Sequence, residues 1–314
     1  MIEIQGLTKK YEELTALNDL NLSIEEGAVF GFIGPNGAGK TTTMRIITTL
    51  LKPTSGKAWI AGHSVTDDPR GVRRVIGYMP DFFGVYDDMK VWEYLDFFAA
   101  CYDVPVNARQ SMVGDLLDLV DLGHKRDAFV DSLSRGMKQR LCLARTLAHD
   151  PQILILDEPA SGLDPRARIE IRELLKELKI MGKTIFFSSH ILSEVADICT
   201  SIAIMEAGNL VVHGDMEEMK RQIRTHRLIQ VKVLGELAPL QERLIQLPNI
   251  ADIVTSAEME LPPDTVRFDF NGDDEALSQL LGSLIGDGIK IISFHEEQGD
   301  LEDVFLQVTQ GVVN

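Results

Sequence analysis

Residues 34–42 read Gly34-Pro35-Asn36-Gly37-Ala38-Gly39-Lys40-Thr41-Thr42, and they fit the phosphate-binding pattern G-x-x-x-x-G-K-S/T without a mismatch. The apolar run from Ala28 to Ile33 precedes them, and a helical pattern from Thr42 to Leu51 follows. This order of strand, loop and helix is the context that the motif requires. A match to the four fixed positions arises by chance in about one chain of this length in a hundred. The stretch therefore predicts a phosphate-binding loop.

Each part of this loop has a chemical role. Glycines at 34, 37 and 39 let the backbone turn tightly and aim successive N–H groups at one point, and the following helix adds the positive end of its dipole. Lys40 is expected to reach the β- and γ-phosphates as a point charge, and the Thr41 hydroxyl is placed to ligate Mg²⁺. We therefore predict a site for ATP and Mg²⁺. Its candidate contacts are Gly34, Pro35, Asn36, Gly37, Ala38, Gly39, Lys40, Thr41 and Thr42.

Composition limits what the chain can do. At 314 residues it is long enough for two domains and a sizeable core. The net charge of -17 argues against a broad nucleic-acid surface, which needs clustered Lys and Arg, but not against ATP, whose site is local and carries its own Mg²⁺. Cys101, Cys142 and Cys199 are widely spaced, so neither a disulfide framework nor a metal site is indicated and a reducing compartment is expected.

The sequence indicates no targeting or membrane-spanning segment. It begins with the strand-like alternation Met1-Ile2-Glu3-Ile4, without the basic and then apolar layout of a signal peptide. No run approaches about 18 uninterrupted apolar residues. If the protein works at a membrane, we expect another protein to hold it there.

Two acids end a second apolar run. Ile153-Leu154-Ile155-Leu156 suits a strand buried on both faces of a parallel sheet, and it leads into Asp157 and Glu158. Ligand-binding groups belong at the carboxyl ends of such strands. We expect Asp157 to hold Mg²⁺, directly or through water, and Glu158 to orient or deprotonate an attacking water. Helix-capping charges are the alternative, and the phosphate-binding motif makes it the lesser one.

Weaker patterns add further candidates. The run 184–189 reads as another buried strand and ends in His190, which is well placed to sense the γ-phosphate, although a lone histidine is more often structural. Ser134 is a natural helix N-cap, and Gly136 leaves N–H groups of the first turn open to an anion. Tyr11 is either a half-buried strand aromatic or a ring on which adenine stacks.

Together these motifs resemble the ATP-binding subunit of an ABC transporter, and they span about the first 215 residues. The resemblance implies an α/β P-loop ATPase core, an N-terminal antiparallel β part and an inserted helical subdomain over about residues 82–151. In family order the matching pieces are the adenine-stacking Tyr11, the Walker A loop Gly34 to Thr42, the signature Leu133-Ser134-Arg135-Gly136-Met137, Walker B Ile153 to Glu158, the D-loop Ser161-Gly162-Leu163-Asp164 and the switch histidine His190.

Two motifs depart from the family pattern. Asp81 stands where the family has a glutamine after a strand and a proline. An ionised carboxylate can bind Mg²⁺ through a water but cannot donate a hydrogen bond, so Asp81 is a candidate metal ligand beside Thr41 and Asp157. The signature reads Leu-Ser-Arg-Gly-Met rather than Leu-Ser-Gly-Gly-Gln, a variant similar to that of drug- and multidrug-exporter subunits, and it keeps the serine and the second glycine.

Residues 216–314 are expected to form a small α+β accessory domain with an antiparallel sheet and no catalytic constellation. The ending Asp300-Leu301-Glu302-Asp303-Val304-Phe305-Leu306 resembles the tail of exporter-type subunits. An appendage that only dimerises or stabilises the subunit is an equal alternative. The predicted elements are strand 228–233, helix 239–247, strands 250–257 and 265–270, helix 274–285, strand 289–292 and a closing helix 301–310.

The resemblance implies an ATPase that powers export of a substrate through a separate membrane permease. It also implies that two ATP-binding subunits close head to tail on two ATP molecules, with Walker A of one facing Ser134 and Gly136 of the other. We expect the second subunit to be another copy, although the sequence leaves a sister chain open, and we expect no nucleic-acid partner. The implied location is cytoplasmic, on the inner face of the cell membrane, through the permease.

An exposed apolar cluster after Asp81 would need a partner, so the side chains there are candidates for the permease docking surface, with core packing as an equal alternative. They are Phe82, Phe83, Val85 and Tyr86. Two other functions stay open. A non-transport ABC ATPase acting on DNA or ribosomes is disfavoured by the single cassette, the absence of a heptad run and the acidic charge. A weakly hydrolysing nucleotide sensor is disfavoured by Glu158 and His190, while Asp81 leaves it open.

Overall fold

The computed structural model describes residues 1–12, 14–82, 84, 86, 88–192, 195, 197–216, 219, 227–255 and 262–297. The chain divides into two compact units, a first that contains residues 1–216 and a second whose described part is mainly residues 227–297. Each has its own hydrophobic core. The two units are therefore described separately.

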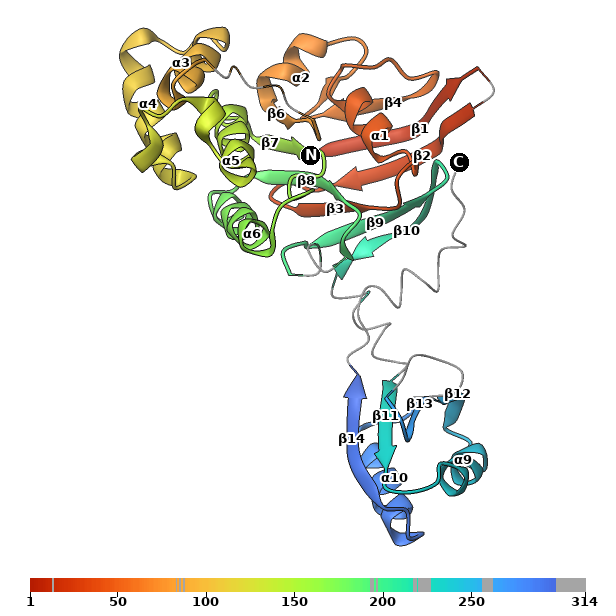
Figure 1. Cartoon of the computed structure of the whole chain (residues 1–314). Helices are drawn as coiled ribbons and strands as arrows, with labels where there is room; N and C mark the ends of the chain where they lie inside the picture. The colour runs from red at the N-terminus through yellow and green to blue at the C-terminus, as the bar shows by residue number, and fades with distance from the viewer. Residues whose placement is uncertain are drawn as a thin grey trace. The chain divides into compact units, whose positions relative to one another are not determined.

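A six-stranded sheet forms the centre of the first unit, in the order β10-β9-β3-β8-β7-β6 (Figure 1). Five of its strands are parallel and β10 runs antiparallel to β9. Every residue of β3, β7 and β8 is buried, which confirms the prediction of strands covered on both faces. The strands are β3 (Val29–Ile33), β6 (Ile76–Met79), β7 (Ile153–Leu156), β8 (Thr184–Ser189), β9 (Ser201–Glu206) and β10 (Asn209–Asp215).

A second, antiparallel sheet of four strands covers one face of this centre, in the order β2-β1-β4-β5. Its inner side chains share one core with α1 (Lys40–Ile47) and with alternate residues of β3, β7 and β8, such as Phe32 and Phe186. This is the predicted N-terminal antiparallel part. Its strands are β1 (Ile2–Tyr11), β2 (Leu14–Ile24), β4 (Ser55–Ile60) and β5 (His63–Ser64).

A short helix that the periodicity did not predict, α2 (Pro69–Val75), connects this sheet to β6. Asp68 caps it by accepting a hydrogen bond from the Gly71 N–H at 2.9 Å, and Pro69 occupies its first turn. The sequence therefore did contain a signal for this helix, namely the capping Asp68 followed by Pro69, and not a repeat of apolar residues.

Helices replace strands between β6 and β7, as predicted. They are α3 (Val91–Cys101), α4 (Val106–Leu119) and α5 (Arg135–Thr146), with two 3₁₀ turns at Gly123–Lys125 and Val130–Ser132. A further helix, α6 (Pro165–Ile180), follows β7 and contacts β8. Among the described helices none is both long enough and apolar enough to span a membrane.

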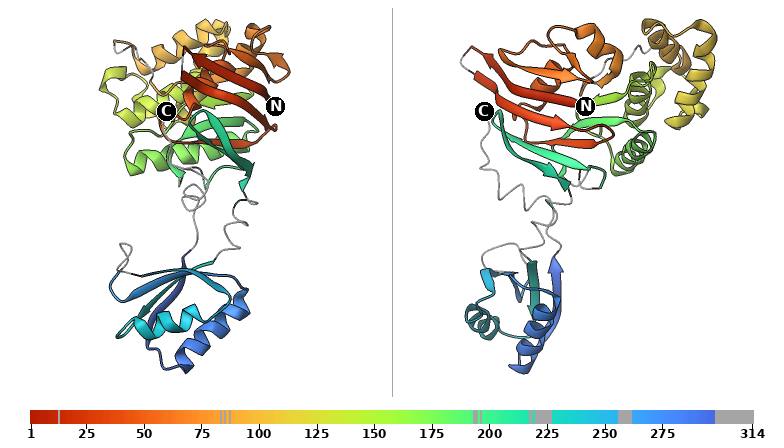
Figure 2. Two further views of the ribbon diagram at one scale, coloured as in Figure 1. Left: turned by 90° about the vertical axis from the view of Figure 1, so that its right-hand side faces the viewer. Right: turned by 180° about the vertical axis from the view of Figure 1, so that it is seen from behind.

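The second unit has the order β11-α9-β12-β13-α10-β14 and an antiparallel sheet arranged β12-β13-β11-β14. This topology is ferredoxin-like. Both helices, drawn in cyan and blue in Figure 2, lie on one face of the sheet, where Leu244 and Leu284 pack against Phe268. The elements are β11 (Arg227–Val233), α9 (Ala238–Ile245), β12 (Ile250–Thr255), β13 (Thr265–Phe270), α10 (Asp274–Gly286) and β14 (Ile291–Glu297). The predicted closing helix 301–310 lies outside the described residues.

Candidate functional site

Parallel pairing of the central strands brings the predicted catalytic residues to one edge of the sheet. β8 pairs with β3 on one side and with β7 on the other, and β6 pairs with β7. The phosphate loop follows β3, Asp157 and Glu158 follow β7, and His190 follows β8. All of these segments leave the carboxyl ends of parallel strands, which is where an open α/β sheet binds its ligands.

Backbone geometry explains why glycines occupy the phosphate loop. Gly37 and Gly39 have φ angles of 84° and 101°, in the left-handed region that side chains disfavour. A Cβ at Gly34 would lie 2.4 Å from the Met205 carbonyl oxygen, and one at Gly39 would lie 2.7 Å from that of Ala16. The loop thus passes closely between β9 and β2, and its tip, Asn36 and Gly37, is exposed.

Lys40 lies within the mouth of the loop and is only 5% exposed. Its Nζ donates to the carbonyl oxygens of Gly34 at 2.6 Å and Pro35 at 3.2 Å. The same ammonium lies 3.4 Å from Oε1 of Glu158, which makes an ion pair without hydrogen-bond geometry. Its positive charge is therefore fixed at the loop, where an anionic ligand would meet it.

Asp157 is a buried carboxylate with one free oxygen. Its Oδ1 accepts a hydrogen bond from Ser188 Oγ at 2.7 Å, while its Oδ2 is buried without a hydrogen-bond partner. Burial raises the pKa of Asp157 above its ordinary value, the Ser188 and Thr41 side chains act to lower it, and the charges of Asp81 and Glu158 raise it further. Both other predicted metal-binding residues, Thr41 and Asp81, therefore lie close enough to act on this carboxyl.

These side chains fit a Mg²⁺ ion. The ion prefers oxygen ligands and is usually bound by one or two carboxylates together with substrate phosphates. No cluster of three or more His, Cys, Asp or Glu side chains suited to a metal is found among the described residues, so a complete protein cage is not offered there. A hydroxyl, a buried acid with an unpaired oxygen and a second acid nearby match the partial set that Mg²⁺ uses with a nucleotide.

Glu158 adopts a strained backbone conformation, with a φ angle of 51°. Its N–H donates to Ser188 Oγ at 2.9 Å, and its Oε2 lies 2.7 Å from Nδ1 of His190. The Glu158 side chain is 11% exposed and that of His190 is 44% exposed. The carboxylate is thus placed between a surface histidine and the loop lysine.

Ser188 lies in the candidate site and was not predicted from the sequence. Its hydroxyl bridges Asp157 Oδ1 and the Glu158 N–H, and it is fully buried. The signal that was available is a polar side chain in a strand that is buried throughout, as are Thr184 and Ser189 of the same strand. Such a side chain needs a buried partner, and two acids end the neighbouring strand.

The signature residues Ser134 and Gly136 lie at the start of α5. Ser134 caps α5 by accepting from the Met137 N–H at 3.3 Å, as predicted, and it is exposed. Gly136 faces Ala167, whose Cβ would be 3.0 Å from a Cβ placed at Gly136. Among the residues that the structure describes, no hydrogen bond or ion pair joins Ser134 or Gly136 to the phosphate loop. One copy therefore does not bring its signature to its own loop.

Tyr11 lies at the end of the hairpin formed by β1 and β2, whose Ala16 packs against Gly39 of the phosphate loop. Its ring is 44% exposed, and Lys9 Nζ lies 5.0 Å from the ring centre. An exposed aromatic face on the hairpin that touches the loop is compatible with adenine stacking, which stays a prediction.

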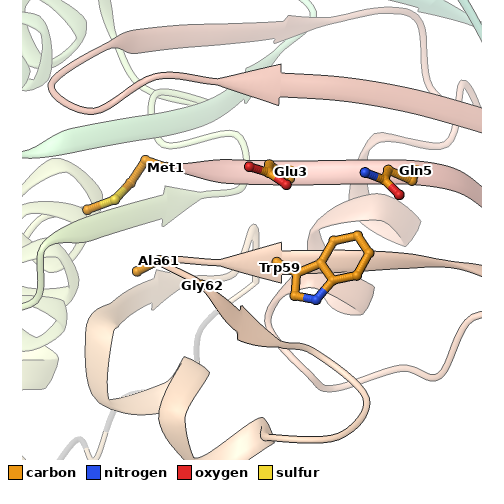
Figure 3. Close-up of a pocket in the computed structure, with 6 residues that line it drawn as sticks. All are labelled: Met1, Glu3, Gln5, Trp59, Ala61 and Gly62. Atoms are coloured by element: carbon orange, nitrogen blue, oxygen red, sulfur yellow. The ribbon is translucent and has the colours of Figure 1, made fainter.

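A separate hollow of about 440 Å³ lies across β1 and β4, on the face of the antiparallel sheet that points away from the core (Figure 3). None of the candidate residues lines it. The lining residues are Met1, Glu3, Gln5, Trp59, Ala61 and Gly62. The site is therefore the edge that carries the phosphate loop, and not this hollow.

The fold and the site define a P-loop nucleotide-binding protein of the class with two acids at the end of a buried strand. The family model described as ABC transporter matches residues 17–161, and the model described as ATP-binding protein DrrA1-3-like, C-terminal domain, matches residues 214–309. The uncharacterized ABC transporter ATP-binding protein YxlF of Bacillus subtilis is 34% identical over 98% of this chain and 99% of its own length. The chain belongs to the family of ABC transporter ATP-binding proteins.

One further relative and two solved structures are also similar to this chain. Nod factor export ATP-binding protein I of Rhizobium meliloti is 34% identical over 98% of this chain and 88% of its own length. A solved ABC transporter ATP-binding subunit is 30% identical, with a TM-score of 0.64, over 71% of this chain and 93% of its own length. The cassette MJ0796, solved as a dimer in a post-hydrolysis state bound to ADP and Pi, is 27% identical, with a TM-score of 0.63, over 69% of this chain and 99% of its own length.

Asp157→Asn is expected to stabilise the protein in the absence of nucleotide. Because burial raises the pKa of Asp157, this group favours the fold most below its unfolded pKa, and that contribution is lost as the pH rises through its folded pKa. At pH 7.5 the neutral amide should raise the unfolding temperature by a few degrees, and the gain should shrink at acidic pH. Thermal unfolding across pH, with and without Mg²⁺ and ATP, tests this.

Asp115 is exposed, and Asp115→Asn is the matched control. It should change neither the unfolding temperature nor the dependence of that temperature on pH. In the Asp157→Asn protein, Mg²⁺ should add no stabilisation to that of ATP. A lower unfolding temperature at pH 7.5 would show that the buried charge is already compensated. A Mg²⁺ effect that persists in Asp157→Asn would show that the cation does not need this carboxylate.

Proposed function

We propose that the chain hydrolyses ATP with Mg²⁺ and that this reaction drives export of a substrate through a separate membrane permease. The observation that carries the proposal is the row of three side chains beside Asp157, in which Glu158 lies 3.4 Å from Lys40 and 2.7 Å from His190. A phosphate-binding lysine, a metal-binding acid and a carboxylate next to both are the parts that phosphoryl transfer to water requires.

Each residue has one task in this proposal. Lys40 neutralises charge on the β- and γ-phosphates. When the nucleotide binds, the Lys40 ammonium leaves the Glu158 carboxylate and pairs with these phosphates instead. Glu158 orients the attacking water and accepts its proton, while His190 fixes the second carboxylate oxygen. Thr41, Asp157 and Asp81 would hold Mg²⁺, which when bound supplies positive charge to the phosphates.

Export as the direction of transport is supported by the relatives. The Rhizobium meliloti and Ralstonia nicotianae proteins named Nod factor export ATP-binding protein I are similar to this chain over 98% of its length, the second unit included. The DrrA1-3-like model matches that second unit separately. We infer that the chain works on the inner face of the cell membrane through its permease.

The arrangement of the signature supports a dimer of two copies. Ser134 and Gly136 are held at the start of α5 and make no bond to their own phosphate loop, whereas the similar MJ0796 cassette was solved as a dimer. In the proposed dimer, each signature closes over the nucleotide on the other copy, with its helix N-terminus toward the γ-phosphate.

A permease docking surface is proposed after β6. Phe82 is 89% exposed, which is unusual for a large aromatic side chain in a protein without a partner. Tyr86 packs against Tyr94, Phe97 and Phe98, with ring centres 5.6–6.4 Å apart, yet it is still 53% exposed, so it stays a candidate beside Phe82. Phe83 and Val85 lie outside the described residues. Phe82 is the more exposed of the two described candidates and is therefore the one to substitute.

Glu158→Gln is expected to lower the steady-state ATPase rate by roughly 10²- to 10⁴-fold, because it removes the proton acceptor. Affinity for ATP should be retained, since Lys40 and the loop glycines are unchanged. The exposed Glu25→Gln, in a turn before β3, is the control and should hydrolyse at the wild-type rate. Equal, very low turnover in all three proteins with normal ATP binding would favour the nucleotide sensor.

The same Glu158→Gln protein should form a dimer when Mg²⁺ and ATP are added, because bound nucleotide that is not hydrolysed keeps the two copies closed. Sedimentation velocity distinguishes the two states. Ser134→Arg in this background should prevent dimerisation by placing a bulky side chain at the closing surface, whereas Ser132→Arg, two residues earlier and equally exposed, should not. A monomer under all conditions would exclude the homodimer.

Tagged Glu158→Gln protein with Mg²⁺ and ATP is expected to recover a polytopic membrane protein from detergent-solubilised membranes of its host. Phe82→Ser should reduce this recovery at least tenfold while leaving ATP binding unchanged. Ile180→Ser, an apolar side chain that is 85% exposed at the end of α6, is the matched control. Recovery of ribosomal or DNA-bound partners instead would contradict the transport function.

A further inference from the structure

Helix α5 contacts the segment directly after Glu158 through two side chains one turn apart. Arg135 donates from its guanidinium to the Ser161 carbonyl oxygen at 3.2 Å. Gln139 donates from Nε2 to the Pro159 carbonyl oxygen at 2.7 Å, and this glutamine is only 3% exposed. Positions i and i+4 lie on one face of a helix, so the first turn of α5 binds two alternate carbonyls of the same short segment.

The segment transmits this attachment to Glu158. The Ser161 N–H donates to the Glu158 carbonyl oxygen at 3.0 Å, so Ser161 is bonded to Arg135 on one side and to Glu158 on the other. Glu158 has a left-handed backbone, which persists only where its surroundings enforce it. Its N–H is fixed by Ser188 and its carbonyl by Ser161. The second of these attachments leads back to α5.

Gly162 completes the contact. Its φ angle is 67°, and a Cβ at this position would lie 2.3 Å from a guanidinium nitrogen of Arg135. The guanidinium therefore occupies the space that any other residue at 162 would fill. The Arg135 guanidinium is a planar group with several donors, so it fits the narrow space between the Ser161 carbonyl and the Gly162 backbone, which has no side chain.

We propose that Arg135, supported by Gln139, is a positioning residue that sets the orientation of the Glu158 carboxylate from the start of α5. The inference rests on the proposed function, in which Glu158 is the proton acceptor. It assigns a role to the arginine that interrupts the usual glycine pair of the signature. Hydrolysis then depends on the position of the helix that begins at Ser134, because a shift of α5 acts on Glu158 through Ser161.

Arg135→Met tests the inference, since it keeps the length of the side chain and removes the donors. Turnover should fall about tenfold, which is the effect of losing one charge-assisted hydrogen bond that stabilises the transition state more than the ground state. Affinity for ADP and the unfolding temperature should stay at wild-type values, because the phosphate loop and the core are untouched. Arg135→Lys keeps one donor and should retain most of the turnover. Arg166→Met removes another exposed arginine, from the first turn of α6, and is the matched control.

Two double variants separate positioning from other roles. In the Glu158→Gln background, Arg135→Met should cause no further loss in single-turnover experiments, because it acts through the carboxylate. Gly162→Ala both displaces the guanidinium and strains a backbone with a φ angle of 67°, so it should lower turnover more in the wild type than in Arg135→Met, which has no guanidinium to displace. Buried Gln139 is left unchanged to avoid a folding defect.

Several outcomes would overturn the inference. Arg135→Met at wild-type turnover, a tenfold loss that persists in Glu158→Gln, or a matching loss of ADP affinity would each do so. If the wild-type protein hydrolyses ATP and Glu158→Gln does not, while Arg135→Met is normal, only this inference fails. If the wild type does not hydrolyse ATP, the proposed function fails first.

Discussion

One serine hydroxyl determines how the two acids of the site are arranged. Ser188 Oγ donates to Asp157 at 2.7 Å and accepts from the Glu158 N–H at 2.9 Å. Ser188 belongs to β8 and the acids follow β7, so this pair of bonds depends on the parallel register that places Leu156 opposite Phe187. A slip of one residue would turn Ser188 to the other face of the sheet and would separate the acids from it. The observed pairing of β7 with β8 thus positions both acids of the site.

Charge at the site is arranged so that a ligand completes it. Lys40 has two carbonyl oxygens and one carboxylate around its ammonium, whereas Asp157 has a buried oxygen without a partner. Burying a carboxylate without full compensation is costly, and the raised pKa of Asp157 expresses that cost. In the proposed function, nucleotide phosphates would draw Lys40 away from Glu158, and a cation would neutralise Asp157. Groups that are costly to bury without ligand would then contribute to binding.

The sequence predicted those parts of the fold and site that depend on local pattern. The phosphate loop, the buried strand before Asp157, the N-cap Ser134 and the order of elements in the second unit all follow from spacing, apolar runs and turn residues. Ser188 and Arg135 could not be assigned in the same way. Their roles arise from hydrogen bonds to residues that lie roughly 30 positions away in the sequence or somewhat closer. Contacts at such separations leave no repeating pattern in the sequence from which they could be predicted. The ferredoxin-like sheet order was also beyond local pattern, because strand neighbours are set by packing.

Asp81 shows how a departure from a family pattern can change a site without removing its chemistry. A glutamine at this position would bring a neutral amide near Asp157, whereas an ionised aspartate brings a second negative charge, which raises the pKa of Asp157. Two neighbouring carboxylates repel each other until a cation lies between them or one takes up a proton. If these acids hold Mg²⁺ as proposed, the second carboxylate would strengthen the dependence of the site on a divalent ion. An aspartate also lacks the amide donor of a glutamine, so in that proposal Asp81 would act on a nucleotide only through its charge and through oxygens that bind metal or water.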